Sequence, residues 1–322
     1  MPKILLTGFA GFIGSHLTEK LLSEEHEVIG IDDFNDYYDP KIKERNISGF
    51  KNHKNFVFNK GDIRDKKFID EIFSKCKPDI VIHLAARAGV RPSLKLPLLY
   101  EEVNVLGTLN LLEAAKNNDC QKFIFGSSSS VYGECKNTPF KETELDLKPI
   151  SPYGVSKLTG EKYCSAYHHL YKLPIICLRF FTVYGPRQRP DLAIYKFTKL
   201  IDEGKPIPVF GDGQYKRDFT YITEIIDGIM GAIKYNKSSF EIFNLGESHT
   251  TSVVDLIKLL ENTIGKKAKV DWQEAQAGDV PLTYADVSKA EQFLGYRPRT
   301  APEEGIKKFV EWYRSNLSFV IQ

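Results

Sequence analysis

Short apolar segments alternate with longer amphipathic segments along the first half of the chain. Runs rich in β-branched and aromatic residues predict strands at 3–7, 28–32, 56–60, 80–84, 122–127 and 174–179. Segments long enough for helices lie between them at 15–23, 64–75, 98–117 and 152–171. In the last two, apolar residues recur three and four positions apart. Short apolar strands that alternate with helices are typical of a parallel sheet covered on both faces.

The alternation ends after Phe181. Glycine and proline cluster at 185–190 and 204–213, and helical patterns then dominate the rest of the chain. Thr300 and Glu303 have the spacing of a capping box ahead of an amphipathic segment, so we expect a helix with Thr300 as its N-cap.

These patterns together predict an α/β protein built from two units. Residues 1–180 are expected to form a doubly wound parallel sheet. Residues 181–322 are expected to form mainly a smaller, mixed α/β lobe, from which later segments return to the first unit. At about 150 residues per domain, a chain of 322 residues suits this division.

Composition narrows the class of protein further. The 44 Lys and Arg residues nearly balance the 42 Asp and Glu residues, so we expect no nucleic-acid partner. No apolar run approaches the roughly 20 residues of a membrane-spanning helix, so we expect no membrane partner. The five cysteines form no CxxC pair and no metal-type spacing with histidine, which predicts reduced thiols, no metal site and a cytoplasmic location.

A glycine triplet follows the first predicted strand directly, at Gly8, Gly11 and Gly14. Glycine permits a tight turn and a close approach of the backbone to a pyrophosphate, and a following helix offers free N–H groups at the positive end of its dipole. The second strand ends at Asp32 and Asp33, 18 and 19 residues after the last glycine. Asp32 is suited to accept hydrogen bonds from the ribose hydroxyls of NAD and to repel the 2′-phosphate of NADP.

The ends of the next two predicted strands extend this candidate cofactor site. Asp62 and Ile63 follow the third strand, where the adenine edge would lie in such a sheet. Leu84, Ala85 and Ala86 follow the fourth, and their small size would let a dinucleotide lie against the strand ends. The ordered set at successive strand ends favours NAD over ordinary loop chemistry.

Tyr153 and Lys157 form a YxxxK pair within the segment 152–171. The spacing puts both on one helix face. A phenol of pKa about 10 is a poor base near neutral pH, but a neighbouring ammonium favours the phenolate. Tyr153 is therefore a candidate acid/base for alcohol oxidation, with Lys157 tuning it and holding the nicotinamide ribose. A run of serines at 127–130 follows the fifth strand and could place a hydroxyl on the same substrate oxygen.

The motifs and their order resemble the extended short-chain dehydrogenase/reductase family, specifically its NAD-dependent nucleotide-sugar 4-epimerases. The resemblance covers nearly the whole chain. It is carried by TGFAGFIG (7–14), IDDFNDYYDP (31–40), HLAARAGVRPS (83–93), SSSSVYG (127–133), SPYGVSKLTGE (151–161), LRFFTVYGPRQRPDLA (178–193) and RDFTYI (217–222).

The resemblance implies a Rossmann-type domain that binds NAD and a smaller lobe that binds a UDP-sugar. It makes Tyr153 the base, Lys157 its partner and Ser128 the assisting hydroxyl. To the cofactor site it adds Phe12, Ile13, Asn35, Asn104 and Ser127. To the substrate site it assigns Arg217 at the pyrophosphate, Asp279 at the uridine ribose, and Arg91, Ser128, Ser129, Ser130, Thr182, Arg189 and Ala193. It also implies a homodimer formed through the helices at 98–117 and 152–171.

The residues before Val131 bear on the reaction. Related 4,6-dehydratases carry Asp-Glu there and UDP-glucuronate decarboxylases carry Glu, whereas this chain has Ser129 and Ser130, so the acid and base for elimination are missing. Thr182 together with Arg187-Gln188-Arg189-Pro190-Asp191 looks like the corresponding segment of UDP-glucuronate 4-epimerases. A threonine hydroxyl and the planar guanidinium of Arg189 could bind the C6 carboxylate of a uronic acid. We therefore expect interconversion of UDP-glucuronate and UDP-galacturonate through a 4-keto intermediate.

Alternatives stay open at this point. Arg189 could instead brace its own loop, and Thr283 stands where a bulky Tyr narrows the pocket of related UDP-galactose enzymes, so a neutral or N-acetylated UDP-hexose is a second candidate. Arg87 also departs from the Gln or aliphatic residue of many uronate enzymes. A decarboxylase, a dehydrogenase with net redox turnover, and a non-catalytic NAD-binding module are further alternatives. An intact Tyr, Lys and Ser set speaks against the last.

Overall fold

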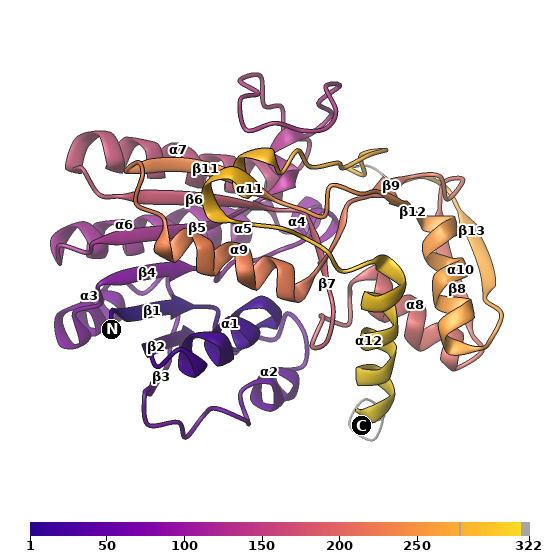
Figure 1. Ribbon diagram of the computed structural model, residues 1–322, viewed down its shortest axis with the longest axis horizontal. Coiled ribbons are helices and arrows are strands. Elements are labelled where there is room, and N and C mark those ends of the chain that lie inside the picture. The colour runs from indigo at the N-terminus through magenta and orange to yellow at the C-terminus, as the bar shows by residue number, and fades with distance from the viewer. Residues whose placement is uncertain (277, 317–322) are drawn as a thin grey trace.

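The computed structural model describes residues 1–276 and 278–316. In this part of the chain, seven parallel strands form one central sheet (Figure 1). Its strands lie in the order β11, β6, β5, β4, β1, β2, β3. Their bounds are β1 Lys3–Thr7, β2 Glu27–Asp32, β3 Phe56–Lys60, β4 Ile80–His83, β5 Lys122–Ser128, β6 Ile175–Phe180 and β11 Phe240–Leu245.

Helices cover both faces of this sheet, and each face has its own apolar core. One face packs against α1 (Phe12–Ser23) and α9 (Ile222–Lys234), which also contact each other. The other packs against α3 (Lys66–Cys76), α6 (Gly107–Asn117) and α7 (Pro152–Tyr171). Because the five inner strands carry apolar residues toward both sides, they are almost completely buried, whereas the edge strands β3 and β11 are partly exposed. The doubly wound, Rossmann-type α/β fold expected from the sequence is confirmed.

The strand order reverses between β1 and β4, which determines where a ligand can bind. From β1 the chain builds outward through β2 to β3, and from β4 it builds the other way through β5 to β6. Thr7 at the end of β1 pairs with His83 at the end of β4. The loops that leave these two strands diverge, and in open α/β sheets the crevice between them is the usual ligand site.

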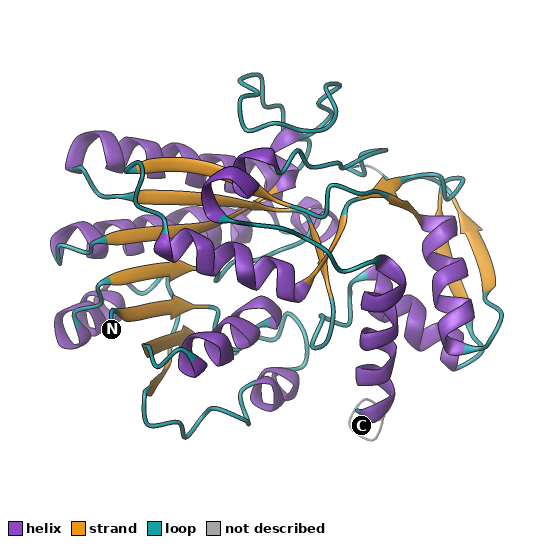
Figure 2. Cartoon of the chain, in the orientation of Figure 1, coloured by secondary structure: helices purple, strands orange, loops and turns teal. Residues whose placement is uncertain are grey.

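A smaller lobe lies at one end of the sheet, to the right in Figure 2. Its helices are α8 (Ala193–Asp202), α10 (Val253–Ile264) and α12 (Pro302–Ser315), and α10 contacts both others. Among the described residues, short strands pair there as β7 (Thr182–Tyr184) with β10 (Phe219–Tyr221), β8 (Pro206–Phe210) with β13 (Lys269–Gln273), and β9 (Lys216–Arg217) with β12 (Thr251–Ser252). The smaller elements are α2 (Pro40–Asn46), α4 (Val90–Lys95), α5 (Pro97–Tyr100), η1 (Glu101–Leu106), η2 (Ser129–Tyr132) and α11 (Ser288–Leu294).

Some details depart from the sequence pattern. The segment 98–117 is not one α-helix, because η1 in its middle is a π-helical turn. The prediction that Thr300 forms the N-cap of a capping box was wrong. Helix α12 begins at Pro302 with Ala301 as N-cap, and the Thr300 hydroxyl hydrogen-bonds the buried Glu224 carboxylate instead.

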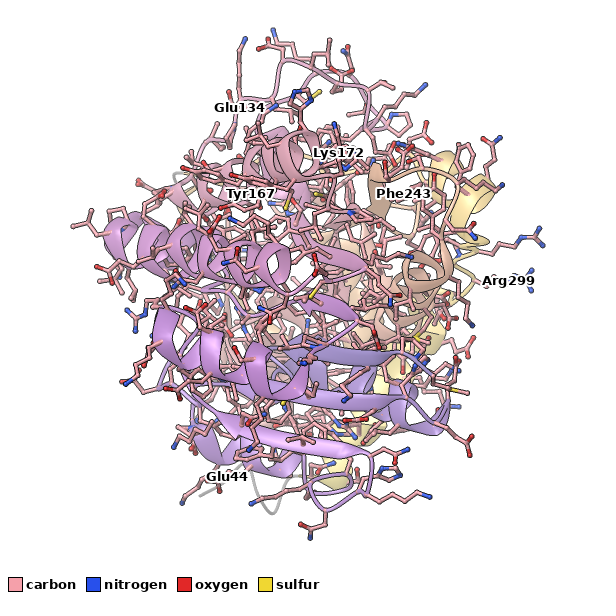
Figure 3. All side chains as sticks on the ribbon, turned by 90° about the vertical axis from the view of Figure 1, so that its left-hand side faces the viewer. Glu44, Glu134, Tyr167, Lys172, Phe243 and Arg299 are labelled. Carbon is pink, nitrogen blue, oxygen red and sulfur yellow. The ribbon has the colours of Figure 1, made fainter. Side chains whose placement is uncertain are left out.

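Because the strands lie side by side, the segments that connect them are spread along the width of the sheet. Figure 3 views the molecule from the left of Figure 1, with Glu44 of α2 near the lower end and Glu134, after η2, near the upper end. Within the described residues, no helix is both long enough and apolar enough to span a bilayer.

Candidate functional site

The turn from β1 into α1 forms a bare backbone cradle. Gly14 lies so close to the turn that a Cβ atom there would stand 2.1 Å from the carbonyl oxygen of Gly8. Only glycine lets the first turn of α1 pack so closely against β1. Gly11 is the N-cap of α1 and has no capping side chain, so the helix N-terminus presents its N–H groups to the crevice. The arrangement fits a phosphate group.

Asp32 at the end of β2 is held by three donors. Its Oδ2 accepts from the amide of Ala10 at 3.3 Å, and its Oδ1 accepts from the amide of Phe34 at 2.9 Å and from Lys43 Nζ at 2.7 Å. A carboxylate has about four acceptor positions, so Asp32 keeps capacity for a ribose hydroxyl. Lys43 was missed from the sequence. Its ammonium is buried and also lies 3.6 Å from Asp33 Oδ1, so it neutralises part of the acidic charge there.

These groups line one cleft of about 430 Å³ at the switch point of the sheet. The cleft gathers most of the predicted cofactor and substrate residues, namely Gly8, Gly11, Phe12, Ile13, Gly14, Asp32, Asp33, Asn35, Asp62, Ile63, Leu84, Ala85, Ala86, Ser127, Ser128, Ser129, Ser130, Tyr153, Lys157, Thr182 and Arg189. Asn104, Arg91, Ala193, Arg217 and Asp279 are not among its lining residues.

Helix α7 brings Tyr153 and Lys157 to the cleft. Its first turn is capped by Ser151, whose hydroxyl accepts from the Gly154 amide at 3.1 Å. Lys157 Nζ donates to the carbonyl of Gly126 at 2.7 Å, and burial lowers the pKa of this ammonium to about 8. The tuning of Tyr153 by Lys157 stays a prediction, because the ammonium bonds the β5 backbone in this arrangement.

The Tyr153 side chain is half-buried, and two neighbours favour the ionised form of its phenol. Burial raises the pKa of Tyr153, since the phenolate loses its hydration. A hydrogen bond with Ser128 acts against that rise, and so does the positive charge of Arg189. Ser128 lies at the end of β5 and also accepts from the amide of Ser130 at 3.2 Å. The phenol and this hydroxyl are therefore placed to share one oxygen of a bound alcohol.

A buried ion pair behind these groups was not found from the sequence. Arg179 of β6 donates to both oxygens of Glu161 on α7, at 2.9 and 2.8 Å. The Ser127 hydroxyl donates to the same carboxylate at 2.5 Å. Ser127 lies between Gly126, which bonds Lys157, and Ser128. The pair therefore fixes the strand segment that supports the proton-transfer groups.

The loop that carries Arg189 is attached to the sheet domain. His16 of α1 hydrogen-bonds the Pro186 carbonyl at 2.9 Å, and Glu19 of α1 pairs with Arg187 at 2.7 Å. Arg189 itself donates Nε and Nη2 to the two oxygens of Asp191, at 3.0 and 2.7 Å. The guanidinium thus reaches the cleft with part of its charge already paired.

Three predicted substrate residues form a second group where α4 of the sheet domain meets the smaller lobe. Arg91 Nη2 donates to Asp279 Oδ2 at 2.7 Å, and its Cζ lies 4.3 Å from the centroid of the Phe210 ring. Burial lowers the pKa of Arg217, and the charge of Asp279 opposes that shift while that of Arg91 adds to it. Two cations near one carboxylate leave a net positive site, which suits a diphosphate.

Asn104 and Ala193 lie beside the cleft without lining it. The Asn104 amide donates to the Arg87 carbonyl and to the Ser156 hydroxyl, both at 2.9 Å, and its Oδ1 accepts from the Arg87 amide at 2.8 Å. Asn104 therefore holds the loop after β4 against α7. Ala193 is the first residue of α8 and follows Leu192, which does line the cleft.

Comparison with known proteins gives one family and several relatives. The family model described as GDP-mannose 4,6 dehydratase matches residues 5–309. A UDP-glucuronate 4-epimerase of Thermodesulfobacterium geofontis is 43% identical over 99% of this chain and 98% of its own. A crystal structure of a UDP-glucuronic acid 4-epimerase from Bacillus cereus, in complex with UDP-glucuronic acid and NAD, is 40% identical with a TM-score of 0.92 and covers 97% of this chain and 99% of its own.

A UDP-glucose 4-epimerase of Thermotoga maritima, solved with UDP-glucose, is 35% identical with a TM-score of 0.90, over 98% of this chain and 99% of its own. The matched relatives thus include a uronate enzyme and a neutral-sugar enzyme. The family description names a dehydratase, whereas this chain has Ser129 and Ser130 in the cleft where the acid and base of dehydration would be needed.

Proposed function

This chain belongs to the extended short-chain dehydrogenase/reductase family of nucleotide-sugar enzymes, as its motifs predicted, and we propose that it is an NAD-dependent 4-epimerase of UDP-glucuronate. The observation that carries the proposal is the placement of Tyr153 and Ser128 in the same cleft as the glycine cradle and Arg189. One cleft thus joins a dinucleotide site, a proton-transfer pair and a cation for a carboxylate.

The residues of the cleft fit NAD. The bare N-terminus of α1 suits the pyrophosphate, and the spare acceptor position on Asp32 suits the adenosine ribose. Asp62 and Asn35 line the same cleft and would flank the adenosine, and Lys157 would reach the nicotinamide ribose. When bound, NAD supplies the acceptor and donor of hydride at C4 of the sugar.

Tyr153 would remove the proton of the 4-hydroxyl as hydride leaves C4, which gives a 4-keto sugar. Ser128 would hydrogen-bond the same oxygen and hold it against the phenol. After the sugar turns over about its link to the diphosphate, Tyr153 would return the proton as hydride adds to the other face. Arg217 and Arg91 would hold the diphosphate throughout, and Asp279 the uridine ribose.

The choice of a uronate rests on Arg189 and Thr182, which both line the cleft. A guanidinium and a hydroxyl can bind a C6 carboxylate by charge-assisted hydrogen bonds. Holding that group matters, because a 4-keto uronate is a β-keto acid that loses CO2 readily. Keeping the C5–carboxylate bond near the plane of the ketone would suppress that loss.

A neutral sugar is the second candidate, on one specific observation. Asp191 already takes two N–H groups of Arg189, so part of the guanidinium's charge is spent inside the protein. An Arg189 that only braced its loop would leave the pocket open to UDP-glucose, as bound in the 35% identical relative. Substrate preference must therefore be measured directly.

The test is a panel of UDP-sugars with product stereochemistry read by NMR. We expect UDP-glucuronate to give UDP-galacturonate with no net absorbance change at 340 nm. Accumulation of NADH, release of CO2, or exclusive turnover of neutral sugars would overturn the proposal. Tyr153→Phe should abolish turnover and leave NAD bound, and activity in that variant would remove Tyr153 from the role of base.

We also propose a cytoplasmic homodimer. Large apolar side chains are exposed along α5, η1 and α7, at Leu98 (76% exposed), Leu106 (48%), Val155 (42%) and Tyr163 (37%). An exposed set of this kind on neighbouring helices favours burial against a second copy. The absence of a paired cysteine among the described residues suits a reducing compartment.

A further inference from the structure

Two arginines lie against one aromatic ring in the cleft. The Cζ atom of Arg189 is 5.0 Å from the centroid of the Tyr37 ring, and that of Arg87 is 5.3 Å from the same centroid. Tyr37 belongs to the loop between β2 and α2, whereas the arginines follow β4 and β7. A guanidinium near an aromatic face is attracted by the negative face of the ring. Tyr37 therefore joins three loops that are remote in sequence.

The far end of Tyr37 is anchored through its hydroxyl. It donates to the Ala88 carbonyl at 2.6 Å, and the Tyr100 hydroxyl donates to the same oxygen at 3.2 Å. Gly89 has φ +116°, and a Cβ there would lie 3.0 Å from the Tyr37 hydroxyl, so glycine permits this approach. The Tyr100 ring contacts the Tyr153 ring edge to face, with centroids 6.2 Å apart. Tyr37 is thus tied to the wall that supports the base.

The backbone of Tyr37 is fixed by two successive side-chain turns. The Asn35 amide N–H donates to Asp33 Oδ1 at 3.1 Å, and the Tyr37 N–H donates to Asn35 Oδ1 at 3.0 Å. Such turns hold a short loop without help from other elements. The position of the Tyr37 ring is therefore set without Arg189, and the ring is a fixed surface against which the guanidinium can rest.

Hydrogen bonds restrain only one edge of the Arg189 guanidinium. Both bonds to Asp191 come from its Nε and Nη2 atoms, and no acceptor in the described part of the chain is bonded to Nη1. Asp191 is two residues away on the same loop and its side chain is 42% exposed. Asp191 can therefore move together with Arg189, and the Tyr37 ring is the contact that ties the guanidinium to the sheet domain.

We propose that Tyr37 is a positioning residue for uronate selection, whose ring holds the Arg189 guanidinium so that its Nη1 edge meets the C6 carboxylate of the substrate. This inference rests on the proposed function and names how the same site tells a uronate from a neutral hexose. Tyr37 does not touch the reacting atoms; it acts through Arg189.

The test compares Tyr37→Leu, which removes the ring, with Tyr37→Phe, which keeps it. Calorimetry on the NAD-loaded protein gives Kd for UDP-glucuronate and for UDP-glucose, and steady-state assays give kcat and KM for UDP-glucuronate. Tyr37→Leu should weaken the binding of UDP-glucuronate by roughly tenfold, and the loss should appear mainly as a higher KM rather than a lower kcat. The Kd for UDP-glucose should change by less than about threefold. Tyr37→Phe should keep most of the preference.

Arg189→Met and the double variant Tyr37→Leu/Arg189→Met complete the cycle. If Tyr37 acts through Arg189, its replacement adds no further loss of preference once the guanidinium is gone. The inference would be overturned if Tyr37→Leu weakened the binding of both UDP-sugars equally. It would also be overturned if Tyr37→Leu still lowered the preference for UDP-glucuronate in the Arg189→Met background. A wild-type protein that neither binds nor converts UDP-glucuronate would overturn the proposed function itself, whereas an unchanged preference in Tyr37→Leu would overturn only the role of Tyr37.

Discussion

Opposing influences set the acidity of Tyr153. Burial raises the pKa of its phenol, while the Ser128 hydrogen bond and the Arg189 charge act to lower it. Arg189 would therefore serve twice, as the group that binds a carboxylate and as a cation that favours the phenolate. A uronate carboxylate bound to Arg189 would weaken the second effect, so recognition and proton transfer are linked at this residue.

The pH profile measures this link. Arg189→Met removes a positive charge, which disfavours the phenolate and raises the pKa of Tyr153. We expect the acid limb of kcat/KM to move to higher pH, by up to about one unit. Arg187→Met is the matched control, because Arg187 lies in the same loop but pairs with Glu19. An acid limb that stays in place in Arg189→Met would show that Arg189 has no electrostatic effect on Tyr153.

The backbone cradle between β1 and α1 depends on glycine at position 14, because any side chain there would collide with the turn. Gly14→Ala would put a Cβ 2.1 Å from the Gly8 carbonyl oxygen, so the turn must open. We expect at least a tenfold weaker affinity for NAD, about 1.4 kcal/mol, measured by fluorescence titration. Gly49→Ala serves as the control, because its nearest contact is 3.8 Å away on the flexible Glu19 side chain. Equal affinities in the two variants would contradict a phosphate cradle at this turn.

Site residues at the ends of strands and at the start of α7 were predictable, and their distant partners were not. Asp32, Tyr153 and Ser128 are recognisable because motif and element coincide in sequence. Tyr37 reaches the cleft from the loop after β2, and Lys43 reaches it from α2. No local spacing in the sequence relates Lys43 to Asp32 or Tyr37 to Arg189. Such contacts arise only once the fold brings separate loops together.

At the scale of elements, the pair Glu161 and Arg179 ties α7 to β6, and Ser127 adds β5. Both charged side chains are almost fully buried, at 3% and 2% exposure. Glu161→Ala would leave the Arg179 guanidinium buried without its partner, so we expect a loss of about 3–5 kcal/mol in the free energy of unfolding. Urea denaturation measures this change.

Asp70→Ala is the control for that substitution. Asp70 pairs with Lys66 one turn away on the exposed surface of α3, and such pairs contribute less than about 1 kcal/mol. Similar losses in the two variants would mean that the buried pair does not hold the three elements together.

Six strands were predictable to within about a residue, because each is a short apolar run between turn residues. Strand β11 was missed, since its sequence FEIFNL lies where helical patterns dominate and its partner β6 ends about 60 residues earlier. Helix α2 was missed as well, because seven mostly charged residues show little periodicity. Thr300 failed as a cap because Glu224, from a distant helix, bonds its hydroxyl.

At the scale of the whole molecule, the two units are joined by more than the chain itself. The loop 185–191 is bonded to α1, and Arg91 after β4 pairs with Asp279 beyond β13. A ligand that spans the cleft and the Arg91–Arg217 group would contact both units. Such a ligand would be held firmly at both ends and less firmly at the sugar between them. That arrangement suits a substrate whose sugar must rotate about its link to the diphosphate during the reaction.

The exposed apolar face predicts self-association. Leu98→Arg should put a charge in the centre of a dimer interface and raise the monomer fraction in analytical ultracentrifugation. Leu145→Arg is the matched control, since Leu145 is 95% exposed and belongs to the loop 134–148 rather than to α5, η1 or α7. A wild-type monomer, or a Leu98→Arg variant that stays dimeric, would contradict this interface.

The late position of β11 has a consequence for the newly made chain. Strand β6 has one neighbour, β5, until residues 240–245 arrive to cover its other side. At roughly 5–20 residues per second, ribosomal synthesis of the intervening 60 residues takes about 3–12 s. During that interval an apolar strand edge lies open to any other extended chain. The nascent protein thus passes through a stage in which it needs protection from aggregation, and that stage ends only when residues 240–245 have been made.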